Sequence, residues 1–296
     1  MIFEVLFSDK NKVKSLKNMT SLYLRSSKIE GKFPLIKMEY THKELISKDF
    51  CYFEREGFCF GFIIKNVNDI EKDAKCCYGK ILKKIDKNQP YRFWNFIPNI
   101  NKETDKGEIY KLFNVGRKDA FRDKYGEEDF KKLPSATGID ILNDKLIIIF
   151  IAGKEKPKHL QNPNQISPYR YPKKYGVKPP SFSRATKLKS QDKEYFFISG
   201  TASIKGHSSM YRNKIDSQFR LTENNLNIML NQGRINYKKV NFNSAIVYLR
   251  NKKDFKNIKE KFQKSFHKLK SVNFLLANIC RKELDLEIEM AIIIDA

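Results

Sequence analysis

Histidine, tryptophan and cysteine are scarce in this chain of 296 residues, which has four histidines, one tryptophan and five cysteines. The cysteines follow no metal-binding or redox spacing, and Cys76 and Cys77 are adjacent. With so few soft or imidazole ligands, the sequence predicts no metal site. We expect the cysteines to be reduced structural thiols of a cytoplasmic protein.

Long hydrophobic runs are also missing. The most apolar stretch, residues 146–153, is far shorter than the roughly 20 residues that a membrane-spanning helix needs. It is typical of a buried strand instead. The first residues carry no basic region ahead of their apolar ones, so no secretory signal is expected. These features predict a cytoplasmic protein that does not span a membrane.

Negative charge is in short supply, because 58 basic residues face 34 acidic ones and the formal net charge is +24. Such an excess is typical of proteins that bind nucleic acids. Only 12 of the basic residues are arginine, however, and the lysines are spread along the chain without a like-charged block. We therefore expect a positive surface that attracts a small dianion, with no specific nucleic-acid partner. A basic nucleic-acid-binding protein without catalysis stays an alternative.

Composition divides the chain into three parts. Residues 1–153 are expected to form an N-terminal α/β module, and residues 188–296 a C-terminal domain. Between them, residues 154–187 hold six of the ten prolines together with tyrosines and arginines. Proline excludes regular helix and central strand, while aromatic residues are unusual in a flexible linker. We therefore expect this connector to be a structured wall of a site.

Apolar periodicity predicts the elements within these parts. In the first part we expect a hairpin that turns at Glu56 and Gly57, a helical pattern over residues 90–122, a small-residue loop over 133–138 and a strand over 145–152. Residues 1–85 otherwise show little pattern. The last third predicts the order β-α-β-α-β-β: strands 195–204, 241–250, 272–280 and 284–294, and helices 217–232 and 254–266. This order predicts an α+β protein with helices on one face of a mixed sheet.

Six motifs in series resemble the chorismatase family. The C-terminal domain opens with Ser-Gly-Thr-Ala-Ser-Ile-Lys-Gly-His (residues 199–207), and the chain ends with Cys-Arg-x-x-Leu-x-x-Glu-Ile-Glu (280–289). The other four motifs occupy residues 93–101, 116–121, 133–138 and the connector segments within 162–185. The resemblance implies two modules, of which the C-terminal one has a RidA/chorismate-mutase-like fold.

The resemblance also implies an activity. Chorismatases cleave the enolpyruvyl ether of chorismate and release pyruvate with a hydroxybenzoate or a dihydroxycyclohexadiene carboxylate. The small dianionic substrate would need no cofactor, and the family points to a monomer. Which product this chain forms stays open, and a RidA-like imine hydrolase is an alternative from the same fold.

Glu287 matches the family's general acid, seven positions after Cys280. Glu287 and Glu289 lie two residues apart on an otherwise apolar strand, so both face the same side. A carboxyl group acts as an acid at neutral pH only if burial raises its pKa from about 4.3 toward about 6 or 7. Glu289 is the second candidate, and a solvated acidic edge is the alternative for both.

A dianion requires cations, and arginine binds carboxylates in a bidentate manner. The residues expected to bind substrate are Tyr169, Arg170, Tyr175, Arg184, Ala202, Arg250, Cys280 and Arg281, with Arg117 as a further candidate. Ala202 and Cys280 match positions where the family varies its product. Surface placement for the arginines, and packing roles for the tyrosines and small residues, are the alternatives.

Overall fold

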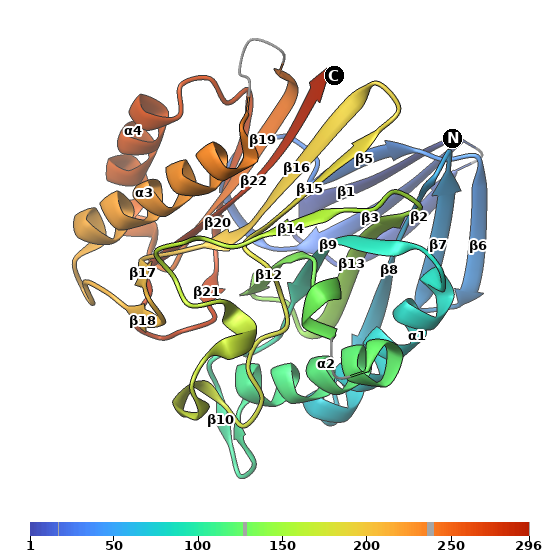
Figure 1. The fold of residues 1–296 in the computed structure, drawn as a ribbon, viewed down its shortest axis with the longest axis horizontal. Coiled ribbons are helices and arrows are strands. Elements are labelled where there is room, and N and C mark those ends of the chain that lie inside the picture. The colour runs from blue at the N-terminus through green and yellow to red at the C-terminus, as the bar shows by residue number, and fades with distance from the viewer. Residues whose placement is uncertain (17, 127–128, 236–239, 296) are drawn as a thin grey trace.

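Two seven-stranded mixed sheets lie face to face, and two helices cover the outer face of each (Figure 1). The computed structural model describes residues 1–16, 18–126, 129–235 and 240–295, although not the side chains of 129, 241 and 242. Among the described residues, no helix combines the length and apolar character needed to cross a membrane.

The first sheet is built mainly from the N-terminal half. Its strand order is β21-β12-β9-β13-β8-β7-β6, and a four-stranded sheet, β2-β3-β1-β5, packs beside it. The elements of this half are β1 (Ile2–Ser8), β2 (Lys12–Leu16), β3 (Met19–Arg25), β4 (Ser27–Glu30), β5 (Ile36–Glu39), β6 (His42–Ser47), β7 (Phe50–Arg55), β8 (Phe58–Asn66), α1 (Ile70–Ile85), β9 (Gln89–Phe96), β10 (Glu103–Thr104), β11 (Gly107–Glu108), α2 (Ile109–Tyr125), the 3-10 helix η1 (Asp129–Lys132), β12 (Ser135–Asp140) and β13 (Lys145–Gly153).

The second sheet has the order β14-β15-β16-β22-β19-β20-β4. Its half of the chain contains β14 (Lys158–Leu160), the 3-10 helices η2 (Pro168–Arg170) and η3 (Lys173–Tyr175), β15 (Ala185–Ser190), β16 (Lys193–Thr201), β17 (Ile204–Lys205), β18 (Ser208–Ser209), α3 (Ile215–Gly233), β19 (Val240–Leu249), the 3-10 helix η5 (Lys252–Asp254), α4 (Phe255–Ser265), β20 (Ser271–Leu276), β21 (Asn278–Ile279) and β22 (Leu286–Asp295).

Each half of the chain lends an edge strand to the other sheet. β4 pairs with β20 of the second sheet, and β21 pairs with β12 of the first. β14 lies within the expected connector and pairs with β15, which begins in the connector, continues past residue 187 and pairs with β16. The domain boundaries expected at residues 153/154 and 187/188 stay predictions. Strand pairing joins the two halves of the chain and also joins the connector to the second sheet, so it does not mark either boundary.

Strand alternation divides the apolar residues among three cores. In β13, Ile147 and Ile149 face the space between the sheets, while Ile148 and Phe150 face α1 and α2. The helices α3 and α4 cover a third core on the outer face of the second sheet. Because both faces of β13 are covered, its sequence is a continuous apolar run rather than an alternating one. Each such side chain stabilises the fold by about 1.5–3 kcal/mol when buried.

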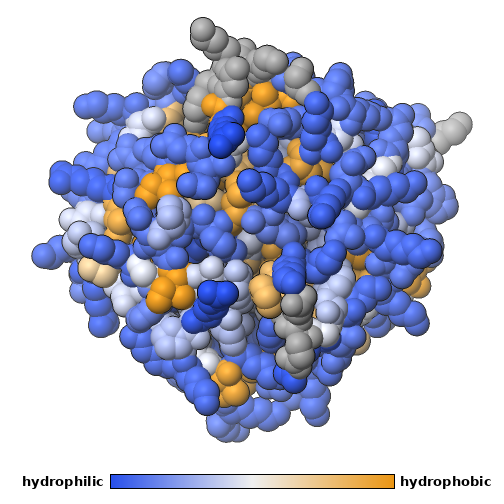
Figure 2. All heavy atoms as spheres, viewed as in Figure 1, coloured by the Kyte–Doolittle hydropathy of each residue, from blue (hydrophilic) through white to orange (hydrophobic). Residues whose placement is uncertain are grey.

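The face of the molecule in Figure 2 is covered mostly by hydrophilic side chains, with small and separate hydrophobic areas between them. Scattered exposed apolar residues of this kind are normal for a folded protein.

Several predictions of local structure are confirmed. The chain has an α+β fold, β7 and β8 form the hairpin at Glu56 and Gly57, and the strand over 145–152 is β13. The last third has the expected order, β16-α3-β19-α4-β20-β22, with both helices on one face of a mixed sheet. Gly206 and His207 turn the chain between β17 and β18.

Other predictions are wrong. Residues 90–96 are not helical as expected but belong to the interior strand β9, and residues 135–138 of the expected loop 133–138 lie in β12. Residues 1–85 hold eight strands and α1 despite their weak pattern. β9 is buried on both faces from Pro90 onward, so its apolar residues carry no alternation that distinguishes a strand from a helix.

The close approach of α1 and α2 gives a stability prediction. A methyl group on Gly116 of α2 would overlap the main-chain oxygen of Glu71, whereas one on Gly79 of α1 would meet nothing within 4 Å. Gly116→Ala is therefore expected to lower the free energy of unfolding by about 1–3 kcal/mol through overpacking. The matched control Gly79→Ala should raise it by about 0.5–1 kcal/mol, because alanine favours helix. Chemical denaturation of both variants checks this, and equal effects at the two sites would contradict it.

Candidate active site

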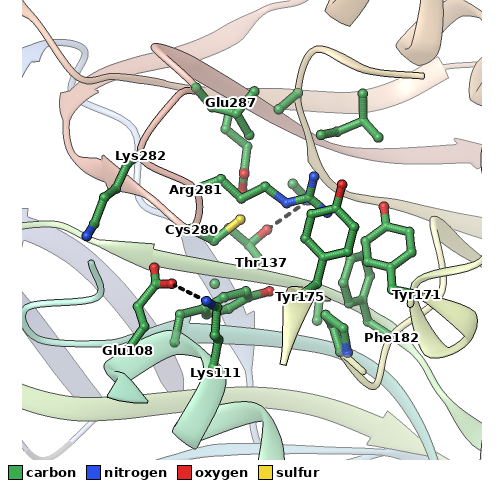
Figure 3. A pocket seen from close by; sticks show the side chains of 18 of the residues that line it. Glu108, Lys111, Thr137, Tyr171, Tyr175, Phe182, Cys280, Arg281, Lys282 and Glu287 are labelled. Atoms are coloured by element: carbon green, nitrogen blue, oxygen red, sulfur yellow. Dashed lines mark hydrogen bonds and ion pairs between the residues drawn. The ribbon is translucent and has the colours of Figure 1, made fainter. Parts of the chain in front are cut away.

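A cavity of about 300 Å³ opens where the two sheets meet the connector. Its wall combines the first turns of α2, β12, the β16–β17 corner, the connector, the segment after β21 and β22. The lining residues are Glu103, Glu108, Tyr110, Lys111, Arg117, Ala136, Thr137, Gly138, Tyr171, Lys174, Tyr175, Pro180, Phe182, Arg184, Gly200, Ala202, Ile204, Cys280, Arg281, Lys282, Glu283, Leu284 and Glu287. Figure 3 shows Glu287 pointing into this space from β22, with Cys280 and Arg281 beside it.

Glu287 is buried, with only 4% of its surface exposed, although it faces the cavity. Its carboxyl group lies against Gly200, because a methyl group at Gly200 would overlap Oε1 of Glu287. Gly200 falls at a register shift between Ile198 and Thr201, where β16 bulges away from its regular pairing with β22. The bulge and the missing side chain together make room for the acid.

The pKa of Glu287 is raised to about 8. Desolvation is the largest cause, and the nearby Glu289 is the second. Arg92 and Arg184 act in the opposite direction but do not offset the burial. A carboxyl group with this pKa carries its proton at neutral pH. Glu287 can therefore donate a proton to a group held in the cavity.

Glu289 has a different environment. Its Oε1 accepts a hydrogen bond from Trp94 Nε1 at 2.7 Å, and its Oε2 accepts one from Arg92 Nη2 at 2.8 Å. The hydroxyl of Thr137 also donates to Oε2. Three donors, one of them a guanidinium, match the acceptor capacity of a carboxylate. Glu289, the second candidate for the acid, does not line this cavity.

Buried guanidinium groups surround the acid. Arg117 is 2% exposed, and its Nε and Nη2 have no hydrogen-bond acceptor among the described residues. Arg184 is 4% exposed and donates through Nη2 to the Tyr171 hydroxyl at 2.6 Å, whereas its Nε finds no acceptor in the described part of the chain. Buried donors of this kind normally have partners. An anionic ligand in the cavity would supply the missing acceptors.

Residues of the expected connector line one side of the cavity. Tyr171, Tyr175 and Phe182 face the cavity in Figure 3. The guanidinium of Arg281 lies 4.0 Å from the ring centre of Tyr175 and donates to His207 O at 2.8 Å. His207 is 3.1 Å from the Tyr175 hydroxyl through Nδ1. His207 therefore links the turn between β17 and β18 to the aromatic wall.

Cys280 and Ala202 both line the cavity that Glu287 faces. The pKa of the Cys280 thiol is raised to about 12. Desolvation is the largest cause, and the nearby Glu287 is the second. The thiol is therefore neutral at physiological pH and is a poor nucleophile. Its size and that of Ala202 shape the space open to a ligand.

The structure brings together six of the nine residues predicted for the site. Glu287, Tyr175, Arg184, Ala202, Cys280 and Arg281 line the cavity, and so does the further candidate Arg117. Their chemical roles stay predictions.

Tyr169, Arg170 and Arg250 lie outside the cavity, so their predicted contacts with substrate gain no support. Tyr169 stacks on Phe130, and Arg170 is exposed above the Tyr169 ring. The guanidinium of Arg250 donates to the main-chain oxygens of Leu284, Ile279 and Arg281, so it fastens the segment between β21 and β22.

Several lining residues were not predicted. Thr137 and Gly138 fall in the motif for which a loop is expected, and Gly200 lies inside the residue 199–207 motif without an expected role of its own. Tyr110, Lys111 and Lys174 carry no distinguishing pattern. Among the described side chains, no three of histidine, cysteine, aspartate and glutamate cluster as metal ligands would.

Fold and site together define an α+β protein with a buried, protonated carboxyl group facing a cation-lined cavity of small-molecule size. Residues 37–152 match the family model described as "Chorismatase FkbO/Hyg5-like, N-terminal". A 3-hydroxybenzoate synthase of Streptomyces hygroscopicus is 30% identical over 223 residues, which are 71% of this chain and 65% of that protein. A chorismatase of Streptomyces rapamycinicus is 31% identical over 209 residues, which are 67% of this chain and 62% of that protein. Over these residues the chain is similar to the chorismatase family.

The same fold is found in a crystal structure of a chorismatase. That structure superposes with a TM-score of 0.85 at 21% identity and covers 98% of this chain and 92% of that one. The alignments with the two Streptomyces proteins span less than two thirds of their lengths. Neither of these relatives favours the imine-hydrolase or nucleic-acid alternative.

The raised pKa of Glu287 predicts a pH-dependent stability. The unfolded state loses this proton near pH 4.5 and the folded state near pH 8, so the folded protein binds more protons between these values. The stabilising contribution is complete below pH 4.5 and is lost as pH rises toward 8. Glu287→Gln has no proton to lose, so its melting temperature relative to the parent should rise between about pH 4.5 and 8 and then level off.

Thermal unfolding at several pH values tests this prediction. The exposed Glu260 provides the control, because Glu260→Gln should stay parallel to the parent protein across the range. A Glu287→Gln curve that also stays parallel would show that Glu287 titrates as an ordinary carboxyl group.

Proposed function

We propose that this protein is a chorismate-cleaving enzyme in which Glu287 is the general acid. The observation that carries the proposal is the protonated carboxyl of Glu287, buried and directed into a cavity lined by guanidinium groups. The names of the relatives support the substrate, since two of them are a chorismatase and a 3-hydroxybenzoate synthase. No resident cofactor takes part in the proposed reaction.

The proposed chemistry begins at the enol ether. Glu287 transfers its proton to the terminal methylene carbon of the enolpyruvyl group, and the positive charge develops on the ether carbon as an oxocarbenium ion. Addition of water to that carbon gives a hemiketal, which collapses to pyruvate and a dihydroxycyclohexadiene carboxylate. Attack or elimination within the ring instead gives pyruvate and a hydroxybenzoate. In each course the ionised Glu287 carboxylate stabilises the developing cation and then recovers a proton.

The carboxylates of the substrate require fixed positive charge. Arg117 and Arg184 present guanidinium N–H groups that lack acceptors among the described residues, and both are buried. Bidentate pairing to a carboxylate would satisfy them and hold the enol ether near Glu287. Lys111 and Lys282 at the rim are already paired with Glu108 and Glu103, so we assign the binding role to the arginines.

The functional unit in this proposal is a cytoplasmic monomer. The five cysteines are free thiols, in keeping with a reducing compartment. Size-exclusion chromatography with light scattering tests the oligomeric state.

Turnover of chorismate tests the central proposal. The purified protein should release pyruvate, measured with a coupled dehydrogenase, and its kcat/KM should fall about tenfold per pH unit above pH 8 as Glu287 ionises. Glu287→Gln should lower kcat by at least roughly 100-fold, the usual contribution of a general acid. Glu260→Gln should keep the parent rate. An active Glu287→Gln enzyme would rule out this acid, and chromatography of the ring product would identify the reaction course.

Arg117 gives a separate prediction about binding. Arg117→Met removes the buried charge while keeping much of the side-chain length, so KM for chorismate should rise by about tenfold or more, the equivalent of roughly 1.5–3 kcal/mol for a charged hydrogen bond. The exposed Arg212, which does not line the cavity, provides the control as Arg212→Met. Steady-state kinetics of both variants measures the effect. An unchanged KM for Arg117→Met would move the carboxylate site elsewhere in the cavity.

A further inference from the structure

A hydrogen-bond chain behind the cavity links Glu289 to the wall on which Glu287 rests. The hydroxyl of Thr137 donates to Oε2 of Glu289 and accepts from Arg92 Nη2 at 2.6 Å. The same hydroxyl accepts from the main-chain nitrogen of Gly200 at 3.1 Å. Gly200 in turn is the residue against which the Glu287 carboxyl lies.

Glu287 itself is not held by comparable contacts. No side-chain hydrogen bond joins its carboxyl to another residue in the part of the chain that the structure describes, whereas Glu289 has three donors. Its position is set by the strand β22 and by packing on Gly200. A displacement of Gly200 would therefore move the acid without removing any bond that it makes.

The two carboxyl groups also influence each other through charge. They lie two residues apart on β22 and face the same side, and each is 4% exposed. In such a poorly solvated space the negative charge of Glu289 opposes ionisation of its neighbour. The other titratable and charged groups coupled to Glu287 are Arg92 from β9, Arg184 before β15, Cys280 after β21, Tyr110 of α2 and Tyr248 of β19.

We propose that Glu289 is a positioning residue: anchored by Arg92, Trp94 and Thr137, it keeps the proton on Glu287 and, through Thr137 and Gly200, aims that carboxyl into the cavity. Glu289 does not touch the substrate. Its negative charge adds to the effect of desolvation on Glu287, and its own position is fixed by the ion pair with Arg92 at 2.8 Å. This role rests on the proposed function of Glu287. It concerns how neighbouring residues set the protonation and the position of that carboxyl group.

Two substitutions test the two parts of the proposal. Glu289→Gln keeps the shape but removes the charge and leaves Arg92 to favour an ionised Glu287. The midpoint of the alkaline limb of kcat/KM should then move down from about pH 8 by at least one unit, so that activity at pH 8 falls several-fold and returns as the pH is lowered. A limb that stays in place while the rate falls equally at every pH would overturn the proposal.

Thr137→Val tests the hydrogen-bonded link from Glu289 through Thr137 to Gly200. This variant keeps the ion pair between Arg92 and Glu289, so it can still be tested if Glu289→Gln does not fold. It should lower kcat about tenfold with little change in KM, because the acid is misplaced while the arginines still bind. Thr137→Ser retains the hydroxyl and should restore most of the rate. Equal activity of Thr137→Val and the parent, or failure of serine to rescue, would contradict the link.

A measurement without substrate separates this inference from the proposed function. The carbonyl stretching band of a protonated carboxyl group, followed by difference infrared spectroscopy against pH, reports Glu287 directly and should vanish in Glu287→Gln. In Glu289→Gln the band should disappear at lower pH than in the parent. If it does so in a protein that releases no pyruvate from chorismate, the positioning role stands and the proposed function fails. An unmoved band in an active enzyme would overturn the positioning role and leave the proposed function intact.

Discussion

Two carboxyl groups on one face of a buried strand set the electrostatics of this protein. Glu287 and Glu289 occupy the central strand β22, away from bulk water, where two negative charges at this separation repel strongly. One buried cation, Arg92, pairs with one of them at 2.8 Å. Glu287 has no such partner among the described side chains, and desolvation together with the nearby Glu289 raises its pKa to about 8. The raised pKa of Glu287 therefore results from the burial of β22 between the packed layers of the protein.

The fold provides this environment through features that lie far apart in the sequence. Arg92 and Trp94 come from β9 of the first sheet, Thr137 from the adjacent strand β12, and the carboxyl groups from the last strand of the second sheet. Face-to-face packing of the sheets brings them within hydrogen-bond distance. The bulge at Gly200 interrupts β16 at the point where β22 presents Glu287. A regular, fully paired strand with a side chain at this position would leave no space for the acid.

Sequence patterns predict a site residue when its polarity differs from that of its neighbours in the chain. They miss a site residue whose neighbours show no distinguishing pattern. Glu287 stands out because it interrupts an apolar strand, and the last third is readable because its helices have one apolar face each. Arg92 gives no signal, and Trp94 stands out only as part of the residue 93–101 motif, since a strand covered on both faces has no alternation and its apolar residues also fit a helix. Arginines cannot be sorted by residue type alone: Arg117 and Arg250 are both candidates for substrate binding, yet one faces the cavity and the other fastens a loop. Only the spatial course of α2 and β21 distinguishes them.

The same desolvation acts on two neighbouring groups with opposite consequences for chemistry. Burial raises the pKa of Glu287 to about 8 and that of Cys280 to about 12. For the carboxyl group this preserves a proton that can be donated at neutral pH, whereas for the thiol it removes the thiolate that covalent catalysis would need. Because desolvation favours the neutral forms of both groups, this cavity suits proton donation by a carboxyl group better than nucleophilic attack by a thiolate. The buried arginines complete this selection, because they retain their charge where weaker cations would lose it and so hold an anionic ligand beside a neutral acid.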